Sequence, residues 1–258
     1  KAWLKPTLQD IIPLSIRHQR NEWRKYLVNL YYIAKKESVL LYQMSKTGSR
    51  SIRESLLAVG FPTARTHRMR LGYLSLLQRK QKLKMITLVR DPMGRHVSHF
   101  FHNYHQHVGE EFRNSNRTIE ELGQIYLNDP QFQQPPVWFD EHIKAEFGLD
   151  IFDHPFEKEK GYTVITQGHI ELLVIKLELD DAIKVNAIAD FLQIRPFPML
   201  RTNIANKKGY AQTYKTFRNT FPFPKSYLDT MYNSRYANHF YTEKEIASFR
   251  SNWQELPA

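Results

Sequence analysis

The sequence of 258 residues contains no cysteine, which excludes disulfides, thiolate zinc ligands and a cysteine nucleophile. No apolar run approaches the ~20 residues of a membrane-spanning helix, and the chain does not open with a signal-peptide pattern. Internal repeats and low-complexity runs are also missing. With 41% hydrophobic residues, including 16 Phe and 14 Tyr, the composition predicts a packed globular protein. The chain begins with Lys1 and not Met, so a preceding targeting or anchoring segment stays open.

Acidic residues are too few to balance the basic ones. The 26 Asp and Glu residues stand against 37 Lys and Arg, which gives a net charge of +11 and a pI near 9.6. An excess of this size predicts an anionic partner. Charge alone leaves nucleic acid, anionic polysaccharide, a membrane surface and a multiply charged nucleotide as alternatives.

Residues 1–37 are basic and partly amphipathic, with a helical pattern through Trp23, Leu27 and Leu30. We expect a basic helical extension over 1–37 and a single domain over 38–258. Two interpretations of the extension stay open. It is a helix packed on the core with a solvated basic face, or it docks to a membrane surface or an acidic polymer.

A short apolar run, Val39 to Leu41, predicts a buried strand, and a helix with apolar Ile52 and Leu56 follows it. A helix start leaves backbone N–H groups without partners and carries partial positive charge, so it attracts phosphate or sulfate. The intervening turn adds two cations, hydroxyls and a glycine that permits close approach. These candidate anion-binding residues are Lys46, Thr47, Gly48, Ser49, Arg50 and Ser51.

A second turn of the same kind follows the apolar run Met85 to Val89. Asp91 suits the cap of the next helix and Pro92 its first position, so Arg90 stands at the carboxyl end of a strand. Ser98 lies nearly two helical turns further on. Arg90 and Ser98 reach one anion only if that ligand runs beside the helix.

Apolar runs continue to alternate with helical patterns along the chain, which predicts an α/β domain with a mostly parallel sheet flanked by helices. Further strands are expected at 63–67, 162–166 and 172–177, and helices at 71–77, 138–147, 183–192, 227–236 and 242–253. Thr242, followed three residues later by Glu245, predicts a capping box at the start of the last helix. The polar segment 203–218 holds Lys207 and Lys208 and is interpreted as a flap over the ligand. The spacing of His99, His102, His105 and His107 can place imidazoles on one helical face, but histidines are common on helix surfaces and no cysteine is present, so no metal is expected.

The segment from Gln43 to Ile52 resembles the 5′-phosphosulfate loop of sulfotransferases that use 3′-phosphoadenosine 5′-phosphosulfate (PAPS). The segment from Thr87 to Pro92, with Arg95 and Ser98, resembles their 3′-phosphate motif. Both motifs occur in the family's order, each after a strand. The resemblance implies a three-layer P-loop-like sulfotransferase fold, with PAPS as sulfuryl donor and adenosine 3′,5′-bisphosphate as product.

Carried over by position, the resemblance assigns the 5′-phosphosulfate to Lys46 and the residues 47–51, and the 3′-phosphate to Arg90 and Ser98. Lys207 and Lys208 resemble the family's late cofactor-gripping loop. Heparan 2-O-sulfotransferases are similar in placing a histidine after the second strand, so His67 is the implied general base. Glu54 and Glu141 remain alternatives for that role.

The segments 138–150, 154–156 and 160–162 are similar to a bacterial group described as capsular polysaccharide synthesis proteins. This similarity implies a carbohydrate acceptor. We expect no nucleic-acid partner and a bacterial cytoplasmic protein, a location that the absence of cysteine fits, with peripheral membrane association through the basic N-terminal segment. Two other functions compete. One is a P-loop nucleotide kinase, although Tyr42 and Gln43 replace the glycines of that motif. The other is a non-enzymatic binder of acidic polysaccharide or nucleic acid.

Overall fold

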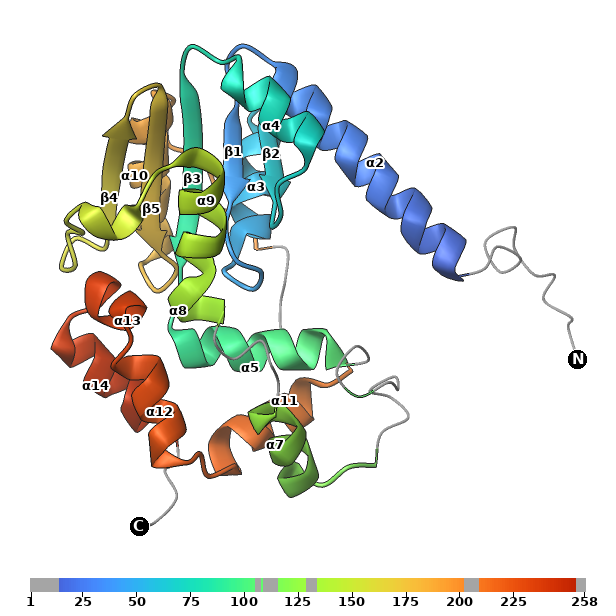
Figure 1. The fold of residues 1–258 in the computed structure, drawn as a ribbon, viewed down its shortest axis with the longest axis vertical. Helices are drawn as coiled ribbons and strands as arrows, with labels where there is room; N and C mark the ends of the chain where they lie inside the picture. The colour runs from blue at the N-terminus through green and yellow to red at the C-terminus, as the bar shows by residue number, and fades with distance from the viewer. Residues whose placement is uncertain (1–13, 105–107, 109–115, 129–133, 202–208, 254–258) are drawn as a thin grey trace, which may run out of the picture.

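The computed structural model describes residues 14–104, 108, 116–128, 134–201 and 209–253 (Figure 1). Its five strands are β1 (Val39–Tyr42), β2 (Thr63–Thr66), β3 (Leu83–Val89), β4 (Tyr162–Gln167) and β5 (Ile170–Lys176). They form one sheet in the order β2-β1-β3-β5-β4. All neighbouring pairs are parallel except β4 and β5, which form an antiparallel pair. The prediction of an α/β protein with a mostly parallel central sheet is therefore confirmed.

The helices before β4 are α2 (Leu14–Ala34), α3 (Ser49–Ala58), α4 (Leu71–Gln78), α5 (Pro92–His102), α7 (Ile119–Leu127), α8 (Gln134–Phe139), the π-helix η3 (Asp140–Lys144), α9 (Ala145–Phe147) and the 3₁₀ turn η4 (Ile151–Asp153). Those after β5 are α10 (Asp181–Leu192), α11 (Ala211–Thr220), α12 (Lys225–Tyr232), α13 (Arg235–Phe240) and α14 (Glu243–Ser251).

Helices cover both faces of the sheet, which explains why β1 and most positions of β3 and β5 are buried and apolar. Leu40 and Tyr42 of β1 pack on one face with residues of α2, α4, α8 and α13. Val39 and Leu41 point to the other face and pack with α3 and α10. The period of two along the strand thus divides the core into two layers.

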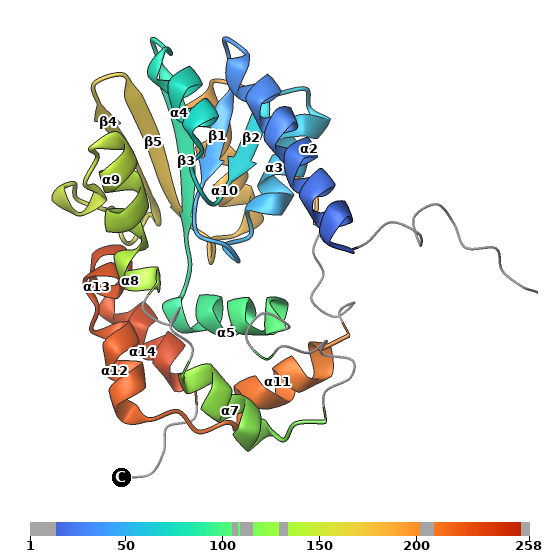
Figure 2. The ribbon, with the colours of Figure 1, turned by 45° about the vertical axis from the view of Figure 1, so that its right-hand side comes forward.

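A third cluster of buried residues lies below the carboxyl edge of the sheet and is built by helices and the segments that join them, without any strand of the sheet. It joins Phe100 of α5, Tyr126 of α7, Phe217 of α11 and Leu228 of α12. Figures 1 and 2 show α5 crossing beneath the sheet, with α7 and α11 on its far side. This helical layer faces the ends of β1 and β3.

Several local predictions are confirmed. Asp91 caps α5 through Met93 and Gly94, with Pro92 at the first helical position. Thr242 and Glu245 form the capping box of α14. The single helix expected over 227–236 is instead two helices, because the Ser234 side chain accepts from the Ala237 N–H and starts α13.

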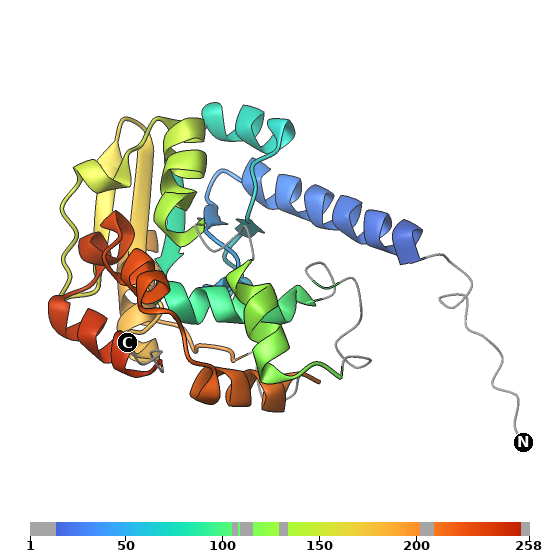
Figure 3. The same cartoon turned by 60° about the horizontal axis from the view of Figure 1, so that its bottom comes forward.

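The long helix α2 packs its inner side on β2 and α4. Figure 3 shows that its N-terminal half projects away from the rest of the molecule. The division into an extension over 1–37 and a domain over 38–258 stays a prediction. Across the described ranges, no helix combines the length and the apolar content that a membrane crossing needs.

Candidate functional site

The site lies where β1 and β3 end. β1 and β3 are parallel neighbours at the centre of the sheet. The chain places β2 on the far side of β1 and β5 on the far side of β3, so the strand order reverses between them. Open α/β sheets bind ligands at such a switch point, outside the carboxyl ends of the strands. A cleft of about 1290 Å³ occupies this position, and its lining residues come from the sheet edge, α5, and α11 with the residues just before it.

The cleft is strongly cationic. The described residues that line it include no Asp or Glu, and the same lining carries six Lys and Arg side chains. Opposed like charges of this density are costly unless an anion neutralises them. The six are Lys46, Arg50, Arg65, Arg90, Lys215 and Arg218.

The turn that follows β1, residues 43–49, is called the β1 turn below. Two of its residues adopt left-handed backbone conformations, Lys46 at φ 69° and Gly48 at φ 80°. Gly48 is also the N-cap of α3, and no side chain caps the helix there. The start of α3 is thus left open to an anion. A Cβ on Gly48 would lie 2.5 Å from Cδ1 of Leu177, whose side-chain end would have to shift, and the left-handed φ of this position favours glycine in any case.

Two hydroxyls of the β1 turn hold the turn itself together. The Thr47 hydroxyl donates to the Met44 carbonyl over 3.0 Å. The Gln43 amide donates to Oγ of Ser49 over 2.7 Å. Both Thr47 and Ser49 are buried, and Thr47 is not among the lining residues. Lys46, Gly48, Ser49, Arg50 and Ser51 do line the cleft, and the structure adds Ser45, which the sequence patterns did not single out.

The two predicted anion motifs are in direct contact. Nη1 of Arg90 donates to the Lys46 carbonyl over 2.8 Å. Arg95, buried on α5, donates from Nε to the Ser45 carbonyl over 3.2 Å and from Nη2 to the Ser45 hydroxyl over 3.1 Å. Arg90 and Ser98 line the same cleft. A ligand that runs beside α5 can therefore contact both Arg90 and Ser98, which is the arrangement that the sequence left open.

The turn that follows β3, Arg90 and Asp91, is called the β3 turn below, and C-terminal helices hold it. The Tyr236 hydroxyl accepts from the Arg90 N–H over 3.0 Å and donates to the Arg90 carbonyl over 2.9 Å. The Tyr232 hydroxyl donates to Oδ1 of Asp91 over 2.9 Å. Burial raises the pKa of the Asp91 carboxyl above its ordinary value, although these hydrogen bonds and Arg90 oppose that rise.

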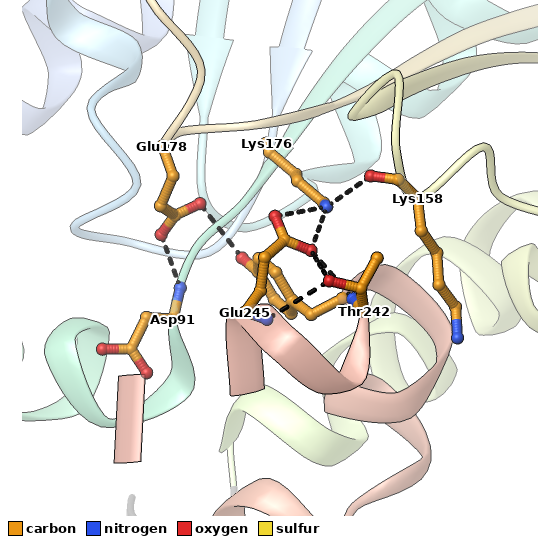
Figure 4. Close-up of polar contacts among 7 residues, drawn as sticks. Asp91, Lys158, Lys176, Glu178, Thr242 and Glu245 are labelled. Atoms are coloured by element: carbon orange, nitrogen blue, oxygen red, sulfur yellow. Dashed lines mark hydrogen bonds and ion pairs between the residues drawn. The ribbon is translucent and has the colours of Figure 1, made fainter. Parts of the chain in front are cut away.

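The end of β5 supports the same turn (Figure 4). Oε1 of Glu178 accepts from the Asp91 N–H over 2.7 Å, and its Oε2 accepts from the Tyr241 hydroxyl over 3.2 Å. Burial raises the pKa of Glu178. Nearby, the Lys176 ammonium, only 1% exposed, contacts both carboxylate oxygens of Glu245 at 2.7 Å. The N-terminus of α14 is thereby fastened to β5.

His67, the predicted base, lines the cleft just beyond β2. Its Nδ1 lies 2.9 Å from the Gln43 carbonyl, which only accepts, so Nδ1 carries the hydrogen. Its Nε2 is then the acceptor and lies 3.3 Å from Nη1 of Arg65. Burial, followed by the charges of Arg65, Arg95 and Lys46, lowers the pKa of His67 to about 4, so the ring is neutral near pH 7.

Arg65 is a site residue that no motif identified. Its guanidinium donates to the Ser49 hydroxyl over 3.4 Å, and burial together with Arg53 and Arg50 lowers its pKa. The backbone of Arg65 is held by Asn29 of α2, whose Oδ1 accepts from its N–H over 3.1 Å and whose Nδ2 donates to its carbonyl over 2.9 Å. This buried amide replaces the missing neighbour of the edge strand β2.

The far wall of the cleft is formed by α11 and the residues just before it. Tyr210, Tyr214 and Arg218 follow one another at four-residue intervals, and Lys215 lies beside them. The sequence analysis interpreted segment 203–218 as a flap over the ligand. The four-residue spacing of Tyr210, Tyr214 and Arg218 is the pattern that indicates one face of a helix in this segment. Lys207 and Lys208 lie outside the described residues.

Of the remaining candidates from the sequence, two glutamates lie outside the cleft and two histidines line it. Glu54 pairs with Arg53 at 2.9 Å and Glu141 is exposed on η3, and neither lines the cleft. His99 and His102 line it, whereas His105 and His107 lie outside the described residues. Within the described part of the chain, no three His, Asp or Glu side chains gather as a metal site.

Comparison with known families gives one match, over residues 112–242, just over half of the chain. The matching family is NKWYS, described as "Putative capsular polysaccharide synthesis protein". The matched range includes α11 and the helices that hold the β3 turn, and it ends before α14. No curated protein and no solved structure matches the chain.

Proposed function

The chain belongs to the NKWYS family, and from that premise and the geometry of the cleft we propose that it is a PAPS-dependent sulfotransferase acting on a hydroxyl of a carbohydrate. The family description supports the carbohydrate part of the proposal. The proposal extends to the fold, which we assign to the three-layer P-loop-like class because an anion turn follows β1 and a second follows the adjacent β3.

One observation carries the proposal. A cleft with six cations and no carboxylate among its described lining residues has two separate places for an anion. One is the open N-terminus of α3 with Lys46, Arg50 and Ser51, and the other is Arg90 with Ser98. A nucleotide with anionic groups at both its 5′ and 3′ positions matches that arrangement better than a nucleotide with a single phosphate chain.

The residues have distinct roles in this proposal. Lys46 and the N-terminus of α3 hold the 5′-phosphosulfate, and Arg90 with Ser98 holds the 3′-phosphate. PAPS supplies an activated sulfuryl group, whose transfer needs orientation and positive charge around the leaving phosphate oxygen. The bond from the acceptor oxygen to sulfur forms as the bond from sulfur to the 5′-phosphate oxygen breaks.

His67 takes the proton of the acceptor hydroxyl at Nε2. The Gln43 carbonyl holds the ring in the tautomer that leaves Nε2 unprotonated, and the acceptor hydroxyl takes the place of the Arg65 guanidinium that lies 3.3 Å from this nitrogen. A pKa near 4 makes the ring a weak base while the surrounding cations are not neutralised. An anion bound at Lys46 and Arg65 opposes those charges, so we expect the basicity of His67 to rise when the nucleotide binds.

The competing kinase function is less well supported. Nucleotide kinases hold magnesium through a carboxylate beside the phosphates, and the described lining of this cleft offers no such group. A protein that only binds polyanions has no need of a histidine held in one tautomer, as His67 is. It also has no need of two separate anion positions at the ends of adjacent strands.

The direct test incubates the protein with PAPS and a panel of bacterial capsular oligosaccharides, and mass spectrometry follows the products. We expect one glycan class to gain a sulfate ester while adenosine 3′,5′-bisphosphate accumulates. The exposed, distant Arg195→Ala variant is the control and keeps the parent rate. Phosphate transfer from ATP to the same glycans, with none of sulfate from PAPS, would overturn the proposal.

A further inference from the structure

The outward side of α2 carries a row of exposed apolar side chains. Trp23, Leu27 and Tyr31 are 57%, 60% and 58% exposed. They follow at intervals of four, which places them on one line along the helix. Large exposed apolar groups gathered in one row are typical of an interaction surface.

Basic side chains flank this row. Arg20 and Arg24 each precede an apolar member by three positions, and Lys35 follows Tyr31 by four, with its ammonium 4.6 Å from the Tyr31 ring. Glu22, the acidic residue within α2, contacts Lys25 and Arg70 instead. We call Arg20, Trp23, Arg24, Leu27, Tyr31 and Lys35 the outer face of α2, and it carries no carboxylate.

The opposite side of α2 is firmly packed. Asn29 is 7% exposed and binds the backbone of Arg65, and Ile33 is 2% exposed in the core against the sheet. Figures 1 and 3 show the helix leaving the body of the protein at this anchored end. The outer face is therefore held in a fixed orientation and turned to solvent.

We propose that the outer face of α2 docks the protein on an anionic lipid surface. Trp and Tyr favour the boundary between headgroups and acyl chains, and a Leu beside them adds apolar area that only the membrane interior removes from water. Arg and Lys in the same plane are attracted by anionic headgroups. The mixture of these groups on one face, without a carboxylate, matches that environment.

Charge argues against the other occupants. A second copy of the chain would bring the same arginines and lysine against each other, with no carboxylate on either face to pair them. A polyanion in solution satisfies the cations and leaves Leu27 and the Trp23 ring in water. Docking does not depend on the proposed reaction, and it is measured without turnover.

The test is co-sedimentation of the full chain with vesicles. One set contains phosphatidylcholine alone, and the other adds phosphatidylglycerol. We expect binding to the anionic vesicles that weakens as salt is added, and little binding to the neutral ones. Each basic residue near an anionic leaflet contributes about fivefold to partitioning, so the Arg20→Glu, Arg24→Glu double variant should bind at least about twentyfold more weakly.

The apolar row has its own variant. Replacing Trp23, Leu27 and Tyr31 together with Ser should weaken partitioning at least about tenfold, because burial of each side chain contributes separately from charge. Val164→Ser with Ile183→Ser is the apolar control, since both are exposed elsewhere. Arg195→Glu with Lys225→Glu is the charge control at two exposed positions outside α2. Both controls should bind as the parent does.

Three results would overturn the proposal. The first is equal binding to neutral and anionic vesicles. The second is unchanged binding of the triple Ser variant, which would assign the interaction to charge alone. The third is a dimer in analytical ultracentrifugation that the triple variant dissociates, which would assign the outer face to a second copy. All variants change exposed side chains, and thermal unfolding checks that each remains folded.

Discussion

The β1 turn and the β3 turn line one cleft but are stabilised in different ways. The β1 turn is fastened by local hydrogen bonds: Thr47 bonds to a residue three positions away, and Gln43 bonds to a residue six positions away. The β3 turn is held by Glu178, Tyr232 and Tyr236, which stand 87, 141 and 146 residues from their partners. The β1 turn thus has local bonds of its own besides its contacts with His67 and Arg95, whereas the β3 turn adds to the Asp91 cap three supports from the C-terminal half of the chain.

This difference has a functional consequence. The C-terminal helices bring Tyr236 to the backbone of Arg90, so a change in those helices reaches the proposed 3′-phosphate position without touching the ligand. The β1 turn contacts the β3 turn mainly through the Arg90 guanidinium on the Lys46 carbonyl. We expect variants of the β1 turn to lower mainly the transfer rate. Variants that remove the support of the β3 turn should lower mainly the affinity for the nucleotide.

Lys46→Ala should have the largest effect. The charge of Lys46 is placed beside the leaving phosphate oxygen in the proposed reaction, and loss of one such group commonly lowers kcat by about 10²–10³. Steady-state sulfuryl transfer measures it. Lys82→Ala, an exposed lysine outside the cleft, is the control and should keep the parent kcat. A parent rate in Lys46→Ala would remove the core of the mechanism.

Tyr236→Phe tests the dependence of the β3 turn on distant contacts. The change leaves the Arg90 N–H and carbonyl without their hydroxyl partner in a buried place, which costs about 1–3 kcal/mol of stability. We expect this stability loss in urea unfolding, together with weaker binding of adenosine 3′,5′-bisphosphate.

The matched control is Tyr227→Phe, whose hydroxyl bonds to His96 and Tyr126 away from the turn. It should lose stability and keep nucleotide affinity. Equal loss of affinity in both variants would show that general destabilisation, and not the support of Arg90, is responsible.

Asn29→Ala should act through Arg65, because Asn29 holds both backbone groups of that residue. We expect a several-fold fall in kcat with a smaller change in KM, since Arg65 contacts His67 and Ser49. Rescue is the check on a positioning role, and Asn29→Gln or Asn29→Asp should recover part of the rate. An effect on stability with no change in kcat would contradict it.

The titration of His67 gives the smallest effect near neutral pH. Burial lowers its pKa from an ordinary 6.5 to about 4, so between these values the unfolded chain takes up a proton that the folded chain does not. The free energy of unfolding should therefore fall as pH drops from 7 toward 4, and less steeply in His67→Gln. NMR titration of the ring should show a higher pKa with adenosine 3′,5′-bisphosphate bound. A pKa near 6.5 without nucleotide would contradict the described burial.

The sequence predicted what local chemistry determines. The strand ends, the cap at Asp91, the capping box at Thr242 and the mostly parallel sheet all follow from spacing and residue type within short windows. Lys46, Gly48, Arg50, Ser51, Arg90 and Ser98 were identified in the same way, and the structure places them around one cleft.

The sequence did not reveal groups whose position depends on packing. Arg65 belongs to no motif, Ser45 lies within the first motif without having been assigned a role, and Asn29 reaches Arg65 only because α2 packs on an edge strand. The support of Arg90 by Tyr236 depends on a contact between residues 146 positions apart, whereas the break of the expected 227–236 helix at Ser234 is a local cap that the helical pattern did not reveal. The donor, the acceptor and the base remain proposals.

The most direct measurement of the central claim is calorimetric titration of the protein with adenosine 3′,5′-bisphosphate, AMP and ATP-magnesium. We expect the bisphosphate to bind at least about tenfold more tightly than AMP, because a charge-assisted contact to the 3′-phosphate contributes about 1.5–3 kcal/mol. Arg90→Gln should remove this preference. Tighter binding of ATP-magnesium, or equal binding of the bisphosphate and AMP, would contradict the account.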